Sequence, residues 1–270
     1  MSDSLPLIIE PEQLAKLLPD SSLLIIDVSQ PALYQQIHIP GAVHISPGEL
    51  VRGIPPATGL LPDIDHLEKL FSRIGLSADK HVIAYDDEGG GWAGRLLWTL
   101  EILGHRRYSY LNGGIHAWYN EHHTVDSDIP DIAPTSFKAT VNYEQRVSLD
   151  EVLNCIEDPD TVIWDARSAE EFHGTRQSAL RNGHIPGAVN LDWLLTMDRS
   201  KNLRLRPLDE LKTMLAQEGI TADKKIITHC QTHHRSGLTW LIAKALTYPV
   251  RAYDGSWSEW GNRLDTPIET

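Results

Sequence analysis

The sequence has 270 residues, 41% of them hydrophobic, and a formal net charge of −13. This length suits one large domain or two ordinary ones, and the apolar content supports packed cores rather than disorder. The acidic balance argues against nucleic acid and anionic membrane surfaces as partners, because both require a basic face. There is no export signal or run of about 18 apolar residues, and Cys155 and Cys230 are the only cysteines. We therefore expect a cytoplasmic protein with free thiols.

Helical and strand patterns alternate along the first half of the chain. Apolar residues recur at helical spacing in residues 9–18, 65–76, 91–103 and 115–119. Apolar runs typical of buried strands occupy residues 23–27, 81–86 and 106–111. Strands that alternate with helices predict an α/β fold, with a mostly parallel sheet flanked by helices.

The second half of the sequence repeats the first. The block His-Ile-Pro-Gly-Ala-Val occurs at residues 38–43 and again at 184–189. Further matches in the same order pair residues 74–86 with 218–230, and 110–118 with 253–260. We therefore predict two similar domains, 1–121 and 147–270, joined by a linker over residues 122–146. Each domain falls within the usual size range, and a Ser-x-x-Glu capping box at Ser148 opens the second.

A cysteine stands at the most informative junction of the second half. Residues 225–229 form a short apolar run that predicts a buried strand, and residues 238–246 have helical spacing, with Ser236 in the place of an N-cap. Cys230 is the first residue after that strand. Amides of a loop that enters a helix N-terminus favour an anion, and a thiolate is such an anion.

The repeat provides an internal control, because Asp86 occupies the position of Cys230 in the first half. The glycines at 89, 91 and 94 formally match a dinucleotide-binding pattern. We disfavour that interpretation, since the carboxylates of Asp86, Asp87 and Glu88 would repel a pyrophosphate. The first half is instead interpreted as an inactive copy, which confines the chemistry to the second half.

These motifs together resemble the rhodanese family, in its bacterial tandem-domain type with a Cys-Gln-Thr-His-His-Arg loop. The resemblance covers nearly the whole chain except the linker and the termini. It rests on the cysteine loop and on Tyr34-x-x-x-His38-Ile-Pro-Gly-Ala, Asp165-Ala-Arg167, Gly183-His-Ile-Pro-Gly-Ala-Val-Asn190 and Tyr253-Asp-Gly-Ser-Trp257-x-Glu259-Trp260. The resemblance implies two rhodanese-like domains, of which only the second is catalytic.

Membership of this family would make the protein a thiosulfate:cyanide sulfurtransferase. The Cys230 thiolate would take the sulfane sulfur of thiosulfate as a persulfide and pass it to cyanide, a thiol or a partner protein, in a ping-pong cycle. No metal, nucleotide or flavin is required. A cysteine pKa of about 8.5 has to be lowered for this role, and a helix N-terminus with a nearby cation can do so.

The candidate site residues follow from the loop and the repeat. The persulfide- and anion-binding loop comprises Gln231, Thr232, His233, His234 and Arg235. Trp193 is a candidate pocket wall, because the turn before it should lie near the cysteine loop. Glu171 stands where the vertebrate enzymes carry an arginine, so that substrate-binding role is not transferred. Arg204 and Arg206 are candidate replacements, but we favour solvated surface positions for both.

Several other functions are alternatives to thiosulfate sulfur transfer. A 3-mercaptopyruvate sulfurtransferase is not excluded by charge, and sequence alone does not separate an enzyme from a persulfide carrier that serves a partner protein. A cysteine phosphatase is disfavoured, because four residues rather than five separate Cys230 from Arg235. A metal site of Cys230, His229, His233 and His234 is disfavoured, because the ligands crowd one loop without a second cluster.

Overall fold

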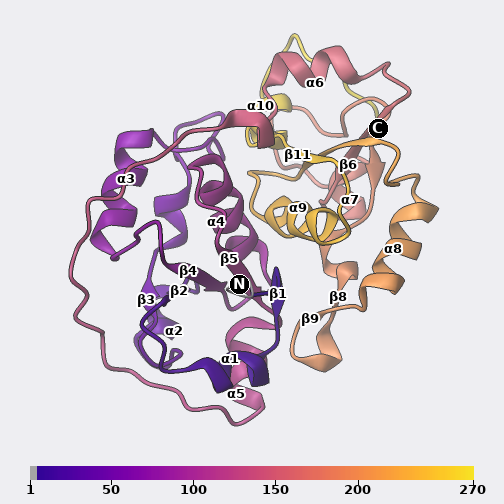
Figure 1. Ribbon diagram of the computed structural model, residues 1–270. Helices are drawn as coiled ribbons and strands as arrows, with labels where there is room; N and C mark the ends of the chain where they lie inside the picture. Colours follow the sequence, from indigo (N-terminus) through magenta and orange to yellow (C-terminus); the bar gives the residue numbers. More distant parts are fainter. Residues whose placement is uncertain (1–4) are drawn as a thin grey trace. The chain divides into compact units, whose positions relative to one another are not determined.

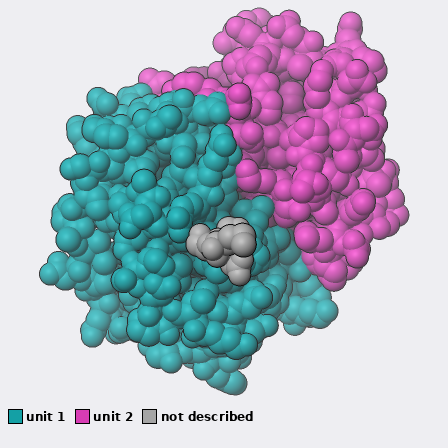
Figure 2. All heavy atoms as spheres, viewed as in Figure 1, with its two compact units in different colours: residues 1–50, 62–142, 198–205 teal, residues 51–61, 143–197, 206–270 magenta. Residues whose placement is uncertain are grey.

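The computed structural model describes residues 5–270, which fall into two compact units coloured separately in Figure 2. Unit 1 comprises Met1–Leu50, Pro62–Asn142 and Asp198–Leu205. Unit 2 comprises Val51–Leu61, Tyr143–Met197 and Arg206–Thr270. Each unit thus includes one short segment that belongs by sequence to the other half of the chain.

Unit 1 contains a five-stranded parallel sheet in the order β1-β5-β4-β2-β3 (Figure 1). Its strands are β1 (Ile8–Ile9), β2 (Leu23–Asp27), β3 (Val43–His44), β4 (His81–Tyr85) and β5 (Tyr108–Leu111). Its helices are α1 (Pro11–Leu17), α2 (Pro31–Tyr34), α3 (Ile64–Arg73), α4 (Gly91–Ile102) and α5 (Gly114–Asn120). The elements predicted from the sequence are found, although the first helix begins only at Pro11, because Ile9 belongs to the two-residue strand β1.

Unit 2 repeats this arrangement with a four-stranded parallel sheet in the order β11-β10-β6-β7. Its strands are β6 (Thr161–Asp165), β7 (Val189–Asn190), β10 (Lys225–His229) and β11 (Val250–Ala252). Its helices are α6 (Leu149–Cys155), α7 (Ala169–Phe172), α8 (Leu208–Gln217), α9 (Arg235–Ala245) and α10 (Ser256–Trp260). The predicted α/β fold with two similar parallel-sheet domains is confirmed.

Short elements complete the chain. Strands β8 (Met197–Asp198) and β9 (Arg204–Leu205) form a separate two-stranded sheet. Short 3₁₀ helices occupy Pro47–Leu50, Tyr143–Gln145, Trp193–Thr196 and Arg199–Lys201. Within residues 5–270, the helices are too short or too polar to cross a membrane.

Strand register shows how closely the two sheets correspond. In unit 1, Asp27 at the end of β2 pairs with Tyr85 at the end of β4. In unit 2, Asp165 at the end of β6 pairs with His229 at the end of β10. The residues that follow β4 and β10, Asp86 and Cys230, therefore leave the same edge of equivalent sheets. Parallel sheets place ligand sites beyond this carboxyl edge.

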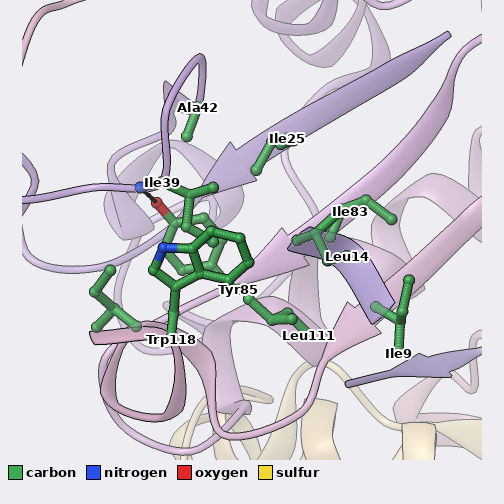
Figure 3. Close-up of a cluster of buried hydrophobic side chains, with 10 residues drawn as sticks. Ile9, Leu14, Ile25, Ile39, Ala42, Ile83, Tyr85, Leu111 and Trp118 are labelled. Atoms are coloured by element: carbon green, nitrogen blue, oxygen red, sulfur yellow. Dashed lines mark hydrogen bonds between the residues drawn. The ribbon is translucent and has the colours of Figure 1, made fainter. Parts of the chain in front are cut away.

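The core of unit 1 forms between the sheet and its helices. Figure 3 shows the indole of Trp118 among aliphatic side chains from several strands and loops, and the Tyr85 hydroxyl accepts a hydrogen bond from the Ile39 amide at 3.1 Å. In unit 2, Tyr253, Trp257 and Trp260 are buried in the corresponding cluster. Burial of each large apolar side chain contributes about 1.5–3 kcal/mol, so these clusters fix the sheets that carry the two loops.

Helix caps agree with one sequence prediction and correct another. Ser148 caps α6, and its hydroxyl accepts a hydrogen bond from the Glu151 amide in a complete capping box, as predicted. Ser236 is not an N-cap, because α9 begins at Arg235 with His234 in the capping position. The Ser236 side chain is buried and hydrogen-bonded to His233 instead.

Candidate active site at the Cys230 loop

Cys230 lies at the carboxyl end of β10 and is completely buried. After four intervening residues the chain enters α9 at Arg235, so the loop turns tightly from strand to helix. The start of α10 anchors the loop from one side. Trp257 donates its amide to the Cys230 carbonyl at 3.0 Å, and Ser258 donates its amide to the Gln231 carbonyl at 2.9 Å. These bonds hold the loop backbone in place before any ligand is bound.

The environment of the Cys230 sulfur favours the thiolate. Burial opposes ionisation and raises the pKa of this thiol. Arg235, the hydroxyl and amide of Ser236, and His234 act in the opposite direction and bring the Cys230 pKa below its ordinary value. The α9 N-terminus supplies the Ser236 amide, as expected where helix amides meet an anion. The loop therefore provides a sulfur nucleophile within a protected site.

Arg235 is held by the carboxylate of Glu171, a residue to which the sequence assigns no substrate-binding role. Its guanidinium makes two hydrogen bonds to the Glu171 carboxylate, Nη1 to Oε2 at 2.6 Å and Nη2 to Oε1 at 3.0 Å. Both side chains are largely buried. Burial raises the Glu171 pKa, but Arg235, together with the Ser168 amide and Arg167, brings it below its ordinary value. A bidentate pair of this kind fixes the orientation of the guanidinium.

The signal for Glu171 was present in the sequence but incomplete. Ser168 and Glu171 form a capping box at the start of α7, and Ser168 donates its amide to the Glu171 carboxylate at 3.2 Å. The Ser-x-x-Glu spacing predicts this helix start. It gives no indication that the same carboxylate also reaches Arg235, which is 64 positions further along the chain.

The two loop histidines have different surroundings. His233 is completely buried, and its Nδ1 lies 2.8 Å from the Ser236 hydroxyl oxygen. His234 meets the ring of Trp193 edge to face, with 5.6 Å between centroids. Trp193, the candidate pocket wall, therefore lies beside the cysteine loop. Asp192, next to it, is half-buried, and burial raises its pKa although Arg235 lowers it.

The remaining loop residues are tied to neighbouring segments. The Gln231 side-chain amide donates to the Ser178 carbonyl at 2.8 Å. At Thr232 the backbone meets Gly59, where an added Cβ would lie 2.4 Å from the Thr232 carbonyl oxygen. Only glycine permits this approach. Gly59 belongs to the segment Val51–Leu61, which has no local feature in the sequence that predicts its place against the loop.

A buried polar layer lies beneath the site. Arg167 pairs with Asp165 at 2.6 Å, and its guanidinium lies 4.3 Å from the Trp257 ring. His229 is completely buried, with Nε2 3.6 Å from the Asp165 carboxylate. Among the described residues, no group of three or more His, Cys, Asp or Glu side chains is placed to hold a metal ion.

Two arginines considered from the sequence have other partners. Arg204 is about one-fifth exposed and pairs with Glu10 and, at 2.6 Å, with Glu121, all in unit 1. The prediction of a solvated surface position for Arg204 is therefore wrong. Arg206 pairs with Glu210 at 2.7 Å on the surface, as favoured. The acidic partners of both side chains, Glu10, Glu121 and Glu210, lie outside the Cys230 loop.

The equivalent loop of unit 1 is filled by its own side chain. The Asp86 carboxylate accepts hydrogen bonds from the amides of Glu88, Gly89, Gly90 and Ala93, at 2.8 to 3.2 Å. Burial and the nearby Glu88 raise the Asp86 pKa to about 6, against these amides, so the carboxylate is ionised at neutral pH. The glycine pattern thus serves an internal anion, which occupies amides that a pyrophosphate would need.

Comparisons with known proteins agree with this architecture. The Rhodanese-like domain family matches residues 10–121 and 148–263. A thiosulfate sulfurtransferase of Azotobacter vinelandii is 47% identical over 267 residues, covering 98% of both chains. One of Pseudomonas aeruginosa is 45% identical over 266 residues, covering 98% of this chain and 97% of the relative.

A solved structure shows the same fold at lower sequence identity. The anaerobic ergothioneine biosynthesis enzyme from Chlorobium limicola superposes with a TM-score of 0.87 at 22% identity, covering 98% of this chain and 70% of that one. At this identity the likeness concerns the fold alone. The two matched segments and the relatives that align over nearly the full length carry the assignment. The chain belongs to the rhodanese family.

Proposed function

We propose that this protein is a thiosulfate sulfurtransferase that carries sulfane sulfur as a persulfide on Cys230. The observation that carries the proposal is the buried thiol between β10 and α9, with Arg235, Ser236 and His234 lowering its pKa. The two relatives that align over nearly the whole chain bear the same activity in their names. The chemistry needs no metal, nucleotide or flavin, because the sulfur itself is the group transferred.

The first half-reaction loads the enzyme. The Cys230 thiolate attacks the outer sulfur of thiosulfate, and a sulfur–sulfur bond forms as the bond to the sulfite sulfur breaks. Sulfite leaves with the electron pair. The thiolate and the thiosulfate dianion thus become a persulfide anion and the sulfite dianion. Arg235 and the α9 amides offset the repulsion between the two anions as they approach.

The second half-reaction returns the thiolate. A nucleophilic acceptor such as cyanide attacks the terminal persulfide sulfur, and thiocyanate leaves while the electron pair of the broken bond returns to Cys230. The loop amides that accommodate the thiolate also suit the persulfide, since both are sulfur anions. The two steps form a ping-pong cycle with a covalent intermediate.

The donor and acceptor follow from charge and access. Because Cys230 is completely buried, a small anion suits the donor role. The donor 3-mercaptopyruvate is also anionic, so kcat/KM for both donors has to be compared in one preparation, with a higher value for thiosulfate expected. If the acceptor is a partner protein, this chain acts as a persulfide carrier. In that case we expect one round of sulfur loading without multiple turnover on small acceptors. The free thiols of Cys155 and Cys230 fit a reducing compartment, for which we propose the cytoplasm.

The mass of the intact protein tests the proposal. Thiosulfate should add about 32 Da, cyanide should remove it, and Cys230→Ala should abolish both the mass change and thiocyanate formation. Cys155→Ala is the matched control, because this second thiol lies at the end of α6 and should leave sulfur loading intact. Sulfur transfer from thiosulfate by the Cys230→Ala protein would refute the mechanism.

A further inference from the structure

His233 adopts a backbone conformation that its side chain does not favour. Its φ is +52°, in the left-handed region, where a residue other than glycine costs on the order of 1 kcal/mol. The equivalent position in unit 1 is Gly89, with a φ of +100°. One of two equivalent loops thus uses glycine where the other tolerates a strained histidine. Such strain persists where the side chain has a compensating role.

The His233 side chain points into the site rather than into solvent. Its Nδ1 lies 2.8 Å from the Ser236 hydroxyl oxygen, and both residues are completely buried. The Ser236 hydroxyl in turn acts on the Cys230 sulfur and lowers its pKa as a hydrogen-bond donor. The three side chains form a short chain from imidazole to hydroxyl to sulfur. Unit 1 has Gly89 and Trp92 at the positions of His233 and Ser236, so it contains no such chain.

We propose that His233 is a positioning residue, whose Nδ1–H donates to the Ser236 hydroxyl oxygen and thereby directs the hydroxyl proton to the sulfur of Cys230. A hydroxyl has one proton and can donate it to only one neighbour. If the imidazole nitrogen carries a proton, the Ser236 proton is free to point at the sulfur and to stabilise its anion. This inference rests on the proposed function only where it extends from the thiolate to the persulfide.

Other titratable and charged groups surround the loop and have to stay constant in a test. The loop and α9 contribute His234 and Arg235, and α7 contributes Glu171. The other groups are Asp165 and Arg167 at and after the end of β6, His229 at the end of β10, and Asp192 before the 3₁₀ helix. Variants of His233 and Ser236 leave all of them in place. A change in the ionisation of Cys230 in such variants therefore reports the hydroxyl and what orients it.

Three single variants separate the side chain from the backbone. Ser236→Ala removes the hydroxyl. His233→Gly accepts the positive φ but removes the donor, whereas His233→Asn tolerates the positive φ and retains a side-chain N–H donor. The rate of Cys230 alkylation by iodoacetamide is followed against pH in the full chain, with peptide masses distinguishing Cys230 from Cys155. Alkylation does not need sulfur transfer, so this test can fail without the proposed function failing.

The midpoint of the pH profile should rise by about one unit in Ser236→Ala and in His233→Gly, as for loss of a hydrogen bond to a charged group. The double variant should shift no further than Ser236→Ala alone, because both changes remove one interaction. His233→Asn should restore most of the wild-type midpoint. An unchanged midpoint in His233→Gly or in Ser236→Ala, additive shifts, or no restoration by asparagine would overturn the proposal.

Discussion

The loops after β4 and β10 occupy equivalent places in the two units but hold different groups at the helix N-terminus. Each leaves the carboxyl edge of a parallel sheet and enters a helix after five residues, at Gly91 and at Arg235. In unit 1 the anion at the helix N-terminus is the Asp86 carboxylate, which accepts four backbone amides. In unit 2 a thiol occupies that position. One loop is closed by its own side chain, and the other holds a group that can react.

The difference shows that an amide-lined loop is necessary for this chemistry but does not define it. The unit 1 loop lacks the charged and hydroxyl groups that act on Cys230, since Gly91 and Trp92 stand where unit 2 has Arg235 and Ser236. Four of its amides also donate to the Asp86 carboxylate, which is part of the chain and cannot dissociate. The catalytic character of unit 2 therefore lies in its side chains, on a backbone that both units share.

Moving the cysteine between the loops tests this comparison with the largest expected effect. In the double variant Asp86→Cys, Cys230→Ala, sulfur transfer should stay at least roughly 10³-fold below wild type, because the new thiol lacks a cation and a hydroxyl donor. Thiocyanate formation and intact mass measure turnover and sulfur loading separately. Activity within tenfold of wild type would mean that the amide loop alone is sufficient.

Removing the internal anion should destabilise unit 1. Asp86→Ala leaves four buried amide donors without their carboxylate, and we expect the free energy of unfolding to fall by about 2–4 kcal/mol at pH 7. Urea unfolding followed by tryptophan fluorescence measures this change. Asp87→Ala is the matched control, because that carboxylate accepts only a long hydrogen bond of 3.4 Å from the Gln30 amide. Equal losses in both variants would contradict a special role for Asp86.

The repeat made much of this architecture predictable. Periodicity located the strands and helices, and the matched sequence blocks alone placed Asp86 opposite Cys230. Neither the repeat nor the periodicity predicts contacts between distant segments. The pairing of Glu171 with Arg235 and the approach of Gly59 to Thr232 depend on how elements pack, and neither residue type signals its partner.

The sequence does not predict the positive φ of His233, for a related reason. A glycine in a loop indicates a possible left-handed conformation, as at Gly89 and Gly90 in unit 1, whereas a histidine gives no such indication. Its conformation is imposed by burial and by the bond to Ser236, which only the folded unit provides. Sequence patterns therefore predicted the backbone frame of the site better than the orientation of its side chains.

The smallest expected effect concerns the cation that unit 1 lacks. If Glu171 holds Arg235 in a position that favours the thiolate, Glu171→Gln should raise the Cys230 pKa by about half to one unit, because the guanidinium is no longer fixed. Loss of a nearby negative charge alone would lower that pKa, so the direction of the shift distinguishes the two effects.

The exposed neighbour Glu170 in the same helix provides the control for charge alone. Glu170→Gln should leave the pH profile of Cys230 alkylation unchanged or shift it slightly downward. An upward shift in Glu171→Gln means less thiolate at neutral pH, and therefore slower alkylation below the new midpoint. A downward shift in both variants would show that Arg235 keeps its place without Glu171, and that the carboxylate only weakens the field of the cation.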